Sequence, residues 1–376
     1  MILAVDCREF VPGRVTGIGR FLRGVLEEIA SRRPHLTVLA MVLPGTPIPV
    51  TSPAIRPYAL PRRPTLYWDQ VLLPRRLRAE GASVFFSPYY KAPTFAPCPT
   101  VVTIHDLIPV EFPAYRRGSG RLFAAAFRSW AALLARRAAA VITDSEHSKA
   151  SLVALLGVPA ERIHAIPIGV GAEFVPGGPP AVVAAAAARY GIQAPYLLTV
   201  GNFLPHKNMS RLVAAFERLP PSIREQYTLV LAGAPAPRDR ASPEDSTRLS
   251  RPGVILPGFI RPEDLPALYA GAAALVCPSL AEGFGLPVLE AMACGTPVVC
   301  ARAGALPEVA GEAALYVDPL DVASIAAGIE QVLTDEKLRA RLAAQGPIRA
   351  REFDSKRTSA RLVDLLEAIA RTGKVA

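Results

Sequence analysis

One stretch of the sequence decides the fold, and it reads Ala272-Ala273-Ala274-Leu275-Val276-Cys277-Pro278-Ser279-Leu280-Ala281-Glu282-Gly283-Phe284-Gly285-Leu286-Pro287-Val288-Leu289-Glu290-Ala291-Met292-Ala293-Cys294-Gly295. Its apolar beginning, 272–277, predicts a buried strand. A turn with two glycines follows, and then a helix with Pro287 in its first turn and Gly295 just past its end. Backbone N–H groups before such a helix can approach an anion, which the helix dipole also favours. The stretch therefore predicts a strand–turn–helix unit that binds a negatively charged ligand.

Two glutamates flank this anion cradle. Glu282 lies in the loop, and Glu290 follows eight positions later, inside the helix. Carboxylates accept hydrogen bonds from hydroxyl groups, so the pair suits a ligand with hydroxyls on both sides of a phosphate. A nucleotide sugar has this arrangement. The alternative is a capped core helix whose glycines only turn the chain.

Length and composition limit the class of protein. A chain of 376 residues suits two domains, and 51% hydrophobic residues exclude a disordered protein. No apolar run approaches the length needed to span a bilayer, and the N-terminus reads directly as a strand. We therefore expect a cytoplasmic protein. Five scattered cysteines and five histidines without ligand spacing argue against a zinc site or a disulfide framework.

The net charge of +10 belongs entirely to the first half. Residues 1–170 contain 21 Lys/Arg against 11 Asp/Glu, whereas residues 171–376 contain 21 of each. This asymmetry favours an anionic partner, either a membrane leaflet, a lipid diphosphate or nucleic acid. Nucleic acid is the weakest of these because no nucleic-acid-binding motif accompanies the charge, and the predicted partners exclude it. The alternative is an arginine-rich composition that only aids solubility.

Short apolar runs alternate with helical patterns in both halves, which predicts α/β architecture with parallel strands. In the first half we expect strands at 2–5, 37–42, 84–87, 101–104 and 140–143, and helices at 18–31, 66–80, 121–137 and 149–157. In the second half we expect strands at 196–200, 228–232, 254–256, 273–277, 298–300 and 314–317, and helices at 208–219, 262–271, 287–293, 322–334 and 336–346. The proline-rich segment 44–64 is expected to be extended or looped.

The Pro/Gly-rich segment 171–180 is the best candidate for an inter-domain linker. The expected domains are an N-terminal Rossmann-like domain over 1–172, a C-terminal one over 181–352, and a last segment over 353–376. Apolar residues at helical spacing predict that this last segment is a helix.

The glutamate pair around Gly-Phe-Gly resembles the donor-site signature of the family 4 retaining glycosyltransferases. The resemblance covers essentially the whole chain and implies the GT-B fold, in which two Rossmann-like domains face each other across a cleft and the last helix returns to the first domain. It implies that the N-terminal domain binds the acceptor and the C-terminal domain the nucleotide sugar. It also implies that Glu282 contacts the transferred sugar and Glu290 the ribose, with Gly283, Phe284, Gly285 and Leu286 at the donor.

A cation is expected beside the diphosphate. No Asp-x-Asp pair occurs in the sequence, which disfavours a metal ion. Lys207 follows a predicted strand and precedes a helix, and the resemblance implies that it binds the diphosphate. Many family members carry an arginine where Asn202 stands here, so the second cation has to come from another arginine or from His206. No cofactor is expected, and donor binding is expected to be independent of a metal ion.

The resemblance also assigns residues in the first half. Gly17 and Gly19 open the first long helix and match the family's glycine loop near the donor, and Arg20 is expected to reach an anionic acceptor. His105 ends a predicted strand, and its counterpart in the family contacts the donor sugar. Asp106 is expected either to orient His105 or to cap the following turn, and it is counted with the acceptor site.

The remaining expectations concern the base and the membrane. Phe259 and Ile260 follow a strand at the place where family members hold the nucleotide base. The helical segment 121–137 interleaves apolar residues with arginines, which suits a core stripe or an interfacial helix on a membrane. Arg116 and Arg117, just before it, belong to the same basic half and are expected to share its role.

The leading hypothesis is a metal-independent retaining glycosyltransferase. It would move a hexose, first choice mannose from GDP-mannose, to a glycan or lipid-linked acceptor in envelope polysaccharide synthesis. Catalysis would rest on His105, Lys207 and Glu282, in the cytoplasm or peripherally at the inner face of the membrane. The rival hypotheses are a nucleotide-sugar epimerase of the same fold and a non-catalytic subunit that binds a sugar nucleotide.

Overall fold

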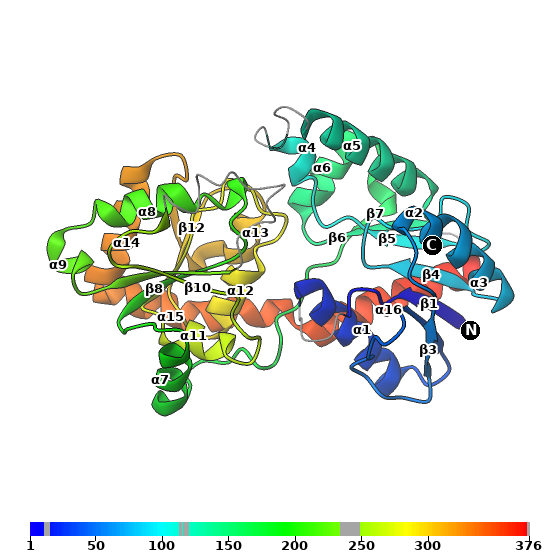
Figure 1. Ribbon diagram of the computed structural model, residues 1–376, viewed down its shortest axis with the longest axis horizontal. Coiled ribbons are helices and arrows are strands. Elements are labelled where there is room, and N and C mark those ends of the chain that lie inside the picture. The colour runs from blue at the N-terminus through cyan, green and yellow to red at the C-terminus, as the bar shows by residue number, and fades with distance from the viewer. Residues whose placement is uncertain (11–15, 113–114, 116–119, 234–248, 374–376) are drawn as a thin grey trace. The chain divides into compact units, whose positions relative to one another are not determined.

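The computed structural model describes residues 1–10, 16–112, 115, 120–233 and 249–373. The chain forms two compact units (Figure 1). Unit 1 consists of Met1–Gly169 together with Ser355–Ala376, and unit 2 consists of Val170–Asp354. The chain passes from unit 1 to unit 2 after Gly169 and returns to unit 1 after Asp354. These two crossing points are adjacent, because Val170 and Asp354 pair in an isolated parallel bridge.

Unit 1 is built on a parallel sheet whose strands, as far as the structure describes them, lie in the order β3-β2-β1-β4-β5-β6-β7. The strands are β1 (Ile2–Asp6), β2 (Thr37–Val42), β3 (Ile55–Ala59), β4 (Val84–Ser87), β5 (Thr100–Thr103), β6 (Ala140–Thr143) and β7 (Ile163–Ala165). The central strands are buried on both faces, which explains their continuous apolar sequences. The chain reverses direction along the sheet between β1 and β4.

Helices cover both faces of this sheet. They are α1 (Gly17–Arg32), α2 (Thr65–Tyr67), α3 (Leu73–Ala79), α4 (Ile108–Glu111), α5 (Gly120–Arg137), α6 (Glu146–Leu156) and α16 (Ser355–Thr372), with a π-helical turn η1 (Trp68–Leu72) and a 3₁₀ turn η3 (Ala160–Arg162). Figure 1 shows α1 and α16 on one side of the sheet and α5 and α6 on the other. The last helix thus packs on α1, with Arg33 Nη2 2.7 Å from Asp364 Oδ1.

Three features of unit 1 were not expected from the sequence. Strand β3 lies inside the proline-rich segment 44–64, where Pro57 is tolerated because β3 is an edge strand. Strand β7 has only three residues, too few for a clear pattern. The segment expected as one helix at 66–80 contains the π-helical turn, a feature that is frequent at functional sites.

Unit 2 repeats the architecture, and its described strands lie in the order β10-β9-β8-β11-β12-β13, all parallel. They are β8 (Tyr196–Val200), β9 (Thr228–Ala232), β10 (Val254–Gly258), β11 (Ala274–Cys277), β12 (Val298–Ala301) and β13 (Leu315–Val317). The direction along this sheet reverses between β8 and β11. The predicted class, two doubly wound α/β halves, is therefore confirmed.

The helices of unit 2 include those expected from the sequence. They are α7 (Pro180–Arg189), α8 (Met209–Glu217), α9 (Pro221–Arg224), α11 (Leu265–Gly271), α12 (Leu286–Ala293), α13 (Leu306–Ala310), α14 (Val322–Thr334) and α15 (Glu336–Ala350), with 3₁₀ turns η4 (Pro205–Lys207), η5 (Gly311–Ala313) and η6 (Arg351–Phe353). Buried side chains of α8 and α14 pack on one face of the sheet. The Pro/Gly-rich segment 171–180, expected as the linker, belongs to unit 2 and leads into α7.

The strand order indicates at which points of the two sheets a ligand is expected to bind. In doubly wound sheets, ligands bind outside the carboxyl ends of the strands where the order reverses. These points are β1/β4 in unit 1 and β8/β11 in unit 2. Throughout the described part of the chain, helices are too short or too polar to cross a bilayer.

Candidate functional site

The loops after β8 and β11 meet at the reversal point of unit 2. The backbone N–H of Leu280 donates to the carbonyl of His206 at 2.7 Å. Asn208, in a left-handed conformation with φ 62°, donates from Nδ2 to the carbonyls of Pro278 (3.0 Å) and Pro319 (2.7 Å). These bonds lock the turn that carries Lys207 against the loop that carries Glu282.

Lys207 and Glu282 form an ion pair at this edge. Lys207 Nζ lies 2.6 Å from Glu282 Oε1, and Ser279 Oγ donates to the same oxygen at 2.7 Å. The side chains of Lys207 and Glu282 are only 14% and 8% exposed. Burial alone would raise the pKa of Glu282, but the Lys207 ammonium and the Ser279 hydroxyl outweigh it and lower that pKa. Glu282 is therefore a carboxylate at neutral pH.

The glycine turn in front of α12 has the conformation that the sequence predicts. Gly285 is the N-cap residue of α12, and its φ of 105° is one that residues other than glycine rarely adopt. Pro287 stands in the first turn of the helix. Gly304, in the neighbouring loop, was not singled out from the sequence. A Cβ at Gly304 would lie 2.5 Å from the carbonyl oxygen of Glu282, so only glycine lets this loop approach the backbone of Glu282.

Glu290 lies inside α12, four residues beyond its first position. It is 3% exposed, and its Oε2 accepts a hydrogen bond from Tyr269 OH at 2.9 Å. Tyr269 sits on α11 and reads in the sequence as an ordinary core residue. The structure thus places the second glutamate on the same turn–helix unit as Glu282, with a fixed side-chain orientation.

The other donor-site candidates differ in exposure. Phe259, directly after β10, is 51% exposed, whereas Ile260 is buried at 7%. Phe259 can therefore present its ring to a ligand, and Ile260 can contribute only through its backbone. Asn202 is exposed after β8, and Phe284 is buried against Phe353.

His206 does not supply the second cation. It is 7% exposed, and burial, reinforced by the neighbouring Lys207, lowers the pKa of His206 to about 4. The imidazole is neutral at physiological pH, so this alternative for the cation missing at Asn202 is wrong.

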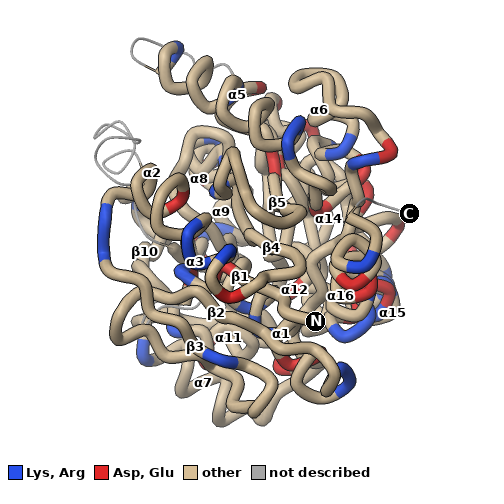
Figure 2. The backbone as a smooth tube through the Cα atoms, turned by 90° about the vertical axis from the view of Figure 1, so that its right-hand side faces the viewer, with Lys and Arg blue, Asp and Glu red and all other residues tan. Residues whose placement is uncertain are grey.

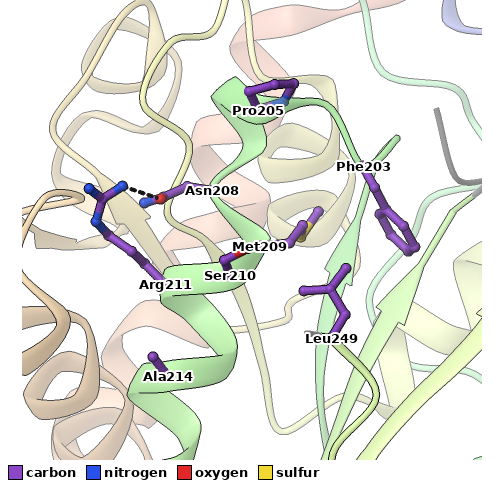
Figure 3. A pocket seen from close by; sticks show the side chains of 8 residues that line it. All are labelled: Phe203, Pro205, Asn208, Met209, Ser210, Arg211, Ala214 and Leu249. Atoms are coloured by element: carbon purple, nitrogen blue, oxygen red, sulfur yellow. Dashed lines mark hydrogen bonds between the residues drawn. The ribbon is translucent and has the colours of Figure 1, made fainter. Parts of the chain in front are cut away.

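A cavity of about 400 Å³ lies beside the Lys207 turn. Figure 3 shows its lining side chains, which are Phe203, Pro205, Asn208, Met209, Ser210, Arg211, Ala214 and Leu249. Arg211 Nη1 donates to Asn208 Oδ1 at 2.9 Å. Arg211 thereby supports the turn that carries Lys207.

The edge of unit 1 carries His105 after β5. Its Nδ1 lies 2.8 Å from Asp144 Oδ2, and its Nε2 lies 3.1 Å from the carbonyl of Pro88. Burial opposes the charged imidazole, but Asp144 outweighs burial and raises the pKa of His105 to about 9. His105 is therefore an imidazolium at neutral pH, with N–H groups directed at both partners.

Asp144, which follows β6, was not assigned to the site from the sequence. For Asp106 the sequence offers two roles, orienting His105 or capping the following turn. The structure shows the second, because Asp106 Oδ1 accepts from the N–H of Ile108 at 3.0 Å. The carboxylate that orients His105 is Asp144, which directly follows β6, the strand next to β5.

The glycine loop of unit 1 is described from residue 16. Thr16 is the N-cap of α1, and its Oγ1 accepts from the N–H of Gly19 at 3.0 Å. Gly17 begins the helix, and Arg20 lies half-buried in its first turn. These residues form a regular capped helix start.

A charged cluster at the β1/β4 reversal was missed entirely. Arg8 Nη2 lies 2.5 Å from Asp6 Oδ2 and 2.7 Å from Asp69 Oδ1, and its guanidinium stacks 3.8 Å over the Trp68 ring. Burial raises the pKa of Asp69 to about 6 although Arg8 opposes the shift. Asp6 could have been found because it directly follows a predicted strand. Asp69 could not, because it lies within a helical pattern.

Comparisons with known proteins cover both units. Residues 15–174 match the family model described as Glycosyltransferase Family 4, and residues 188–349 match the one described as Glycosyl transferases group 1. Among curated proteins, the chain is similar to O-antigen chain mannosyltransferase B from Escherichia coli, with 37% identity over 214 residues. The aligned part is 57% of this chain and 56% of the relative, so the chain spans about half the length of that curated protein.

Two solved structures illustrate the likeness of fold. Sucrose-phosphate synthase from Thermosynechococcus elongatus aligns with a TM-score of 0.76 and 23% identity over 98% of each chain. HepE from Anabaena, solved in complex with UDP-glucose, aligns with a TM-score of 0.75 and 20% identity over 98% of this chain and 100% of its own.

Proposed function

Because the chain belongs to the glycosyltransferases that join a family 4 domain to a group 1 domain on the GT-B fold, we propose that it transfers a hexose from a nucleotide-diphosphate sugar to a glycan or lipid-linked acceptor. The observation that carries this proposal is the Lys207–Glu282 pair at the β8/β11 reversal. It puts an ammonium group and a carboxylate beside the glycine turn of α12.

Each group has a distinct task in this proposal. Lys207 and the backbone amides of residues 283–286 stabilise the departing diphosphate, helped by the N-terminal dipole of α12. Glu282 binds hydroxyls of the transferred sugar, and Glu290 binds those of the ribose. Glu282 holds Lys207 in the ligand-free protein, so the ammonium must exchange this carboxylate for the diphosphate when the donor binds.

His105 acts through its charge. With a pKa of about 9 its imidazolium cannot accept a proton at neutral pH, which argues against a role as general base. We assign it to electrostatic stabilisation of the donor, with Asp144 as its positioning residue. The acceptor hydroxyl then attacks from the face that the diphosphate leaves, a donor phosphate oxygen takes the proton, and the configuration at the sugar is retained.

Mannose from GDP-mannose is the first choice of donor, since the Escherichia coli relative is named a mannosyltransferase. UDP-glucose is the second choice, because HepE was solved with it. Envelope polysaccharide synthesis is the proposed context. The acceptor is assigned to the carboxyl edge of the unit 1 sheet, where Arg20 and the Asp6–Arg8–Asp69 cluster supply charged groups.

The test is a transfer assay with purified protein, labelled GDP-mannose or UDP-glucose, and a lipid-linked saccharide acceptor. Label should move to the acceptor in the wild type, and the Lys207→Ala and Glu282→Ala variants should be at least about a hundredfold slower. Wild-type rates in both variants would contradict the site assignment. Incubation with the donor alone separates transfer from epimerisation, which would convert the donor into an isomeric nucleotide sugar.

A further inference from the structure

Helix α5 of unit 1 has an apolar outer face in addition to its core face. Ala124, Phe127, Ala131, Leu134 and Ala135 are buried against the sheet. On the outer side Leu122 is 78% exposed and Leu133 is 39% exposed. Large apolar side chains are therefore displayed to solvent on a helix whose core contacts are already satisfied.

A neighbouring aromatic residue extends this outer face. Phe95, in the loop after β4, is 75% exposed, and the guanidinium of Arg137 at the end of α5 lies 4.2 Å from the centre of its ring. This cation–π contact fixes Phe95 beside the helix. We call Leu122, Phe123, Leu133 and Phe95 together with the arginines of α5 the α5 face.

The charge of the α5 face has one sign. The sequence of α5 contains Arg121, Arg128, Arg136 and Arg137 and no acidic residue, and Figure 2 shows blue segments along it. The surrounding unit is basic as well. Unit 1 contains 26 Lys/Arg against 13 Asp/Glu, a net charge of +13, whereas unit 2 contains 16 against 19, a net charge of −3.

We infer that the α5 face docks on an anionic lipid bilayer, with α5 lying parallel to the membrane surface. Exposed leucine and phenylalanine beside arginine suit the boundary between headgroups and acyl chains, where apolar side chains enter and arginines meet lipid phosphates. Four arginines exclude a position across the bilayer. Nucleic acid would match the charge but gives no reason for exposed aliphatic side chains such as Leu122.

The experiment is co-sedimentation of the full chain with vesicles of phosphatidylcholine containing phosphatidylglycerol, and with pure phosphatidylcholine vesicles. The protein should bind the anionic vesicles at low salt, with binding weakened at least about tenfold by raising the salt to roughly 0.5 M. The neutral vesicles should bind it much more weakly. No nucleotide sugar is needed, so failure here leaves the proposed transfer standing.

Two variants locate the contact. Arg128→Glu changes two charges and should weaken binding about twentyfold, because each basic residue near a charged leaflet contributes roughly fivefold. Leu122→Asp should weaken binding to a similar extent by removing an inserted side chain and adding a negative charge. Leu320→Asp in unit 2, where Leu320 is 65% exposed, is the matched control and should bind like the wild type.

Several results would overturn the inference. One is no binding to anionic vesicles at low salt, and another is equal weakening by the Leu320 control. Vesicle binding that persists unchanged in both α5 variants would place the contact elsewhere. Binding to a polynucleotide in preference to vesicles would replace the membrane with nucleic acid. Arg116 and Arg117, expected from the sequence to contribute, lie outside the described residues and are left unchanged in these tests.

Discussion

Lys207 Nζ and Glu282 Oε1 lie 2.6 Å apart at the carboxyl edge of the unit 2 sheet. The residues that we assign to the diphosphate and to the sugar thus neutralise each other before a donor arrives. A buried charge that loses an ion-pair partner is strongly destabilised. We therefore expect a bound donor to replace the contact that Lys207 or Glu282 gives up.

Ser279 should matter because it positions Glu282. Its hydroxyl donates to the carboxylate oxygen that Lys207 contacts, and hydrogen bonds to charged groups contribute about 1.5–3 kcal/mol. We expect Ser279→Ala to lower kcat/KM for the donor about tenfold or more, with kcat and the donor KM measured separately. Ser279→Thr should restore most of the rate. The exposed Ser210→Ala is the control, and an equal loss in it would refute the positioning role.

Gly304→Ala should damage the site through the backbone of Glu282. The added Cβ would lie 2.5 Å from the Glu282 carbonyl oxygen, and the left-handed φ of 57° is itself unfavourable for alanine. Transfer should fall up to about a hundredfold, as expected for a displacement of a catalytic group by an ångström. Gly177→Ala, with φ 71° and no neighbouring atom within 4 Å, has the backbone strain without the clash. It should transfer like the wild type; equal damage in both would implicate strain alone.

His105 predicts a stability that depends on pH. Its folded pKa of about 9 lies above the ordinary value of 6.5, so the native state binds the proton more tightly than the unfolded chain. The resulting stabilisation is complete below about pH 6.5 and disappears as the pH rises through 9. Denaturant unfolding should therefore show that the free energy of unfolding of the wild type exceeds that of His105→Gln. This difference should shrink by up to about 3 kcal/mol between pH 6 and pH 9.5.

His164 provides a control of opposite sign. Burial lowers the pKa of His164, so its native state resists protonation and loses stability as the pH falls. The stability of His164→Gln should therefore increase relative to that of the wild type as the pH becomes acidic. If the difference in free energy of unfolding between the wild type and His105→Gln stays constant or widens with rising pH, the His105–Asp144 pair is contradicted.

Donor use should not require a divalent metal. The described residues contain no cluster of three or more His, Cys, Asp or Glu side chains that could hold a metal ion. We propose that Lys207 and the amides before α12 meet the diphosphate charge instead. Transfer measured with excess chelator should remain near its untreated rate, and a complete loss that manganese restores would overturn this proposal.

The sequence predicted the elements of unit 2 that build the edge proposed to bind the donor. A strand–turn–helix unit is specified by local chemistry, through Gly285, Pro287 and the two glutamates. The order of apolar runs places Lys207 after a neighbouring strand, at the same carboxyl edge of the sheet. Ser279 could have been found as well, because it stands three residues before Glu282 in the same loop.

Other features depend on packing that no local pattern encodes. Asp144 lies 39 positions from His105, and their pairing follows from the adjacency of β5 and β6 and from the orientation of both side chains. The neutral state of His206 follows from its burial beside Lys207. Asp69 reaches Arg8 from a π-helical turn inside an apparently regular helix.

The most direct test of the account is calorimetric titration of GDP and UDP, without sugar, into wild type, Lys207→Ala and Glu282→Gln. Lys207→Ala removes the diphosphate cation and should weaken the tighter-binding nucleotide at least about tenfold, equivalent to 1.4 kcal/mol. Glu282→Gln removes the negative charge beside Lys207 and should tighten the same nucleotide about tenfold, while sugar transfer should be lost. Opposite shifts in the two variants are the predicted result. Weaker binding in Glu282→Gln, or unchanged binding in Lys207→Ala, would contradict the assignment of Lys207 to the diphosphate.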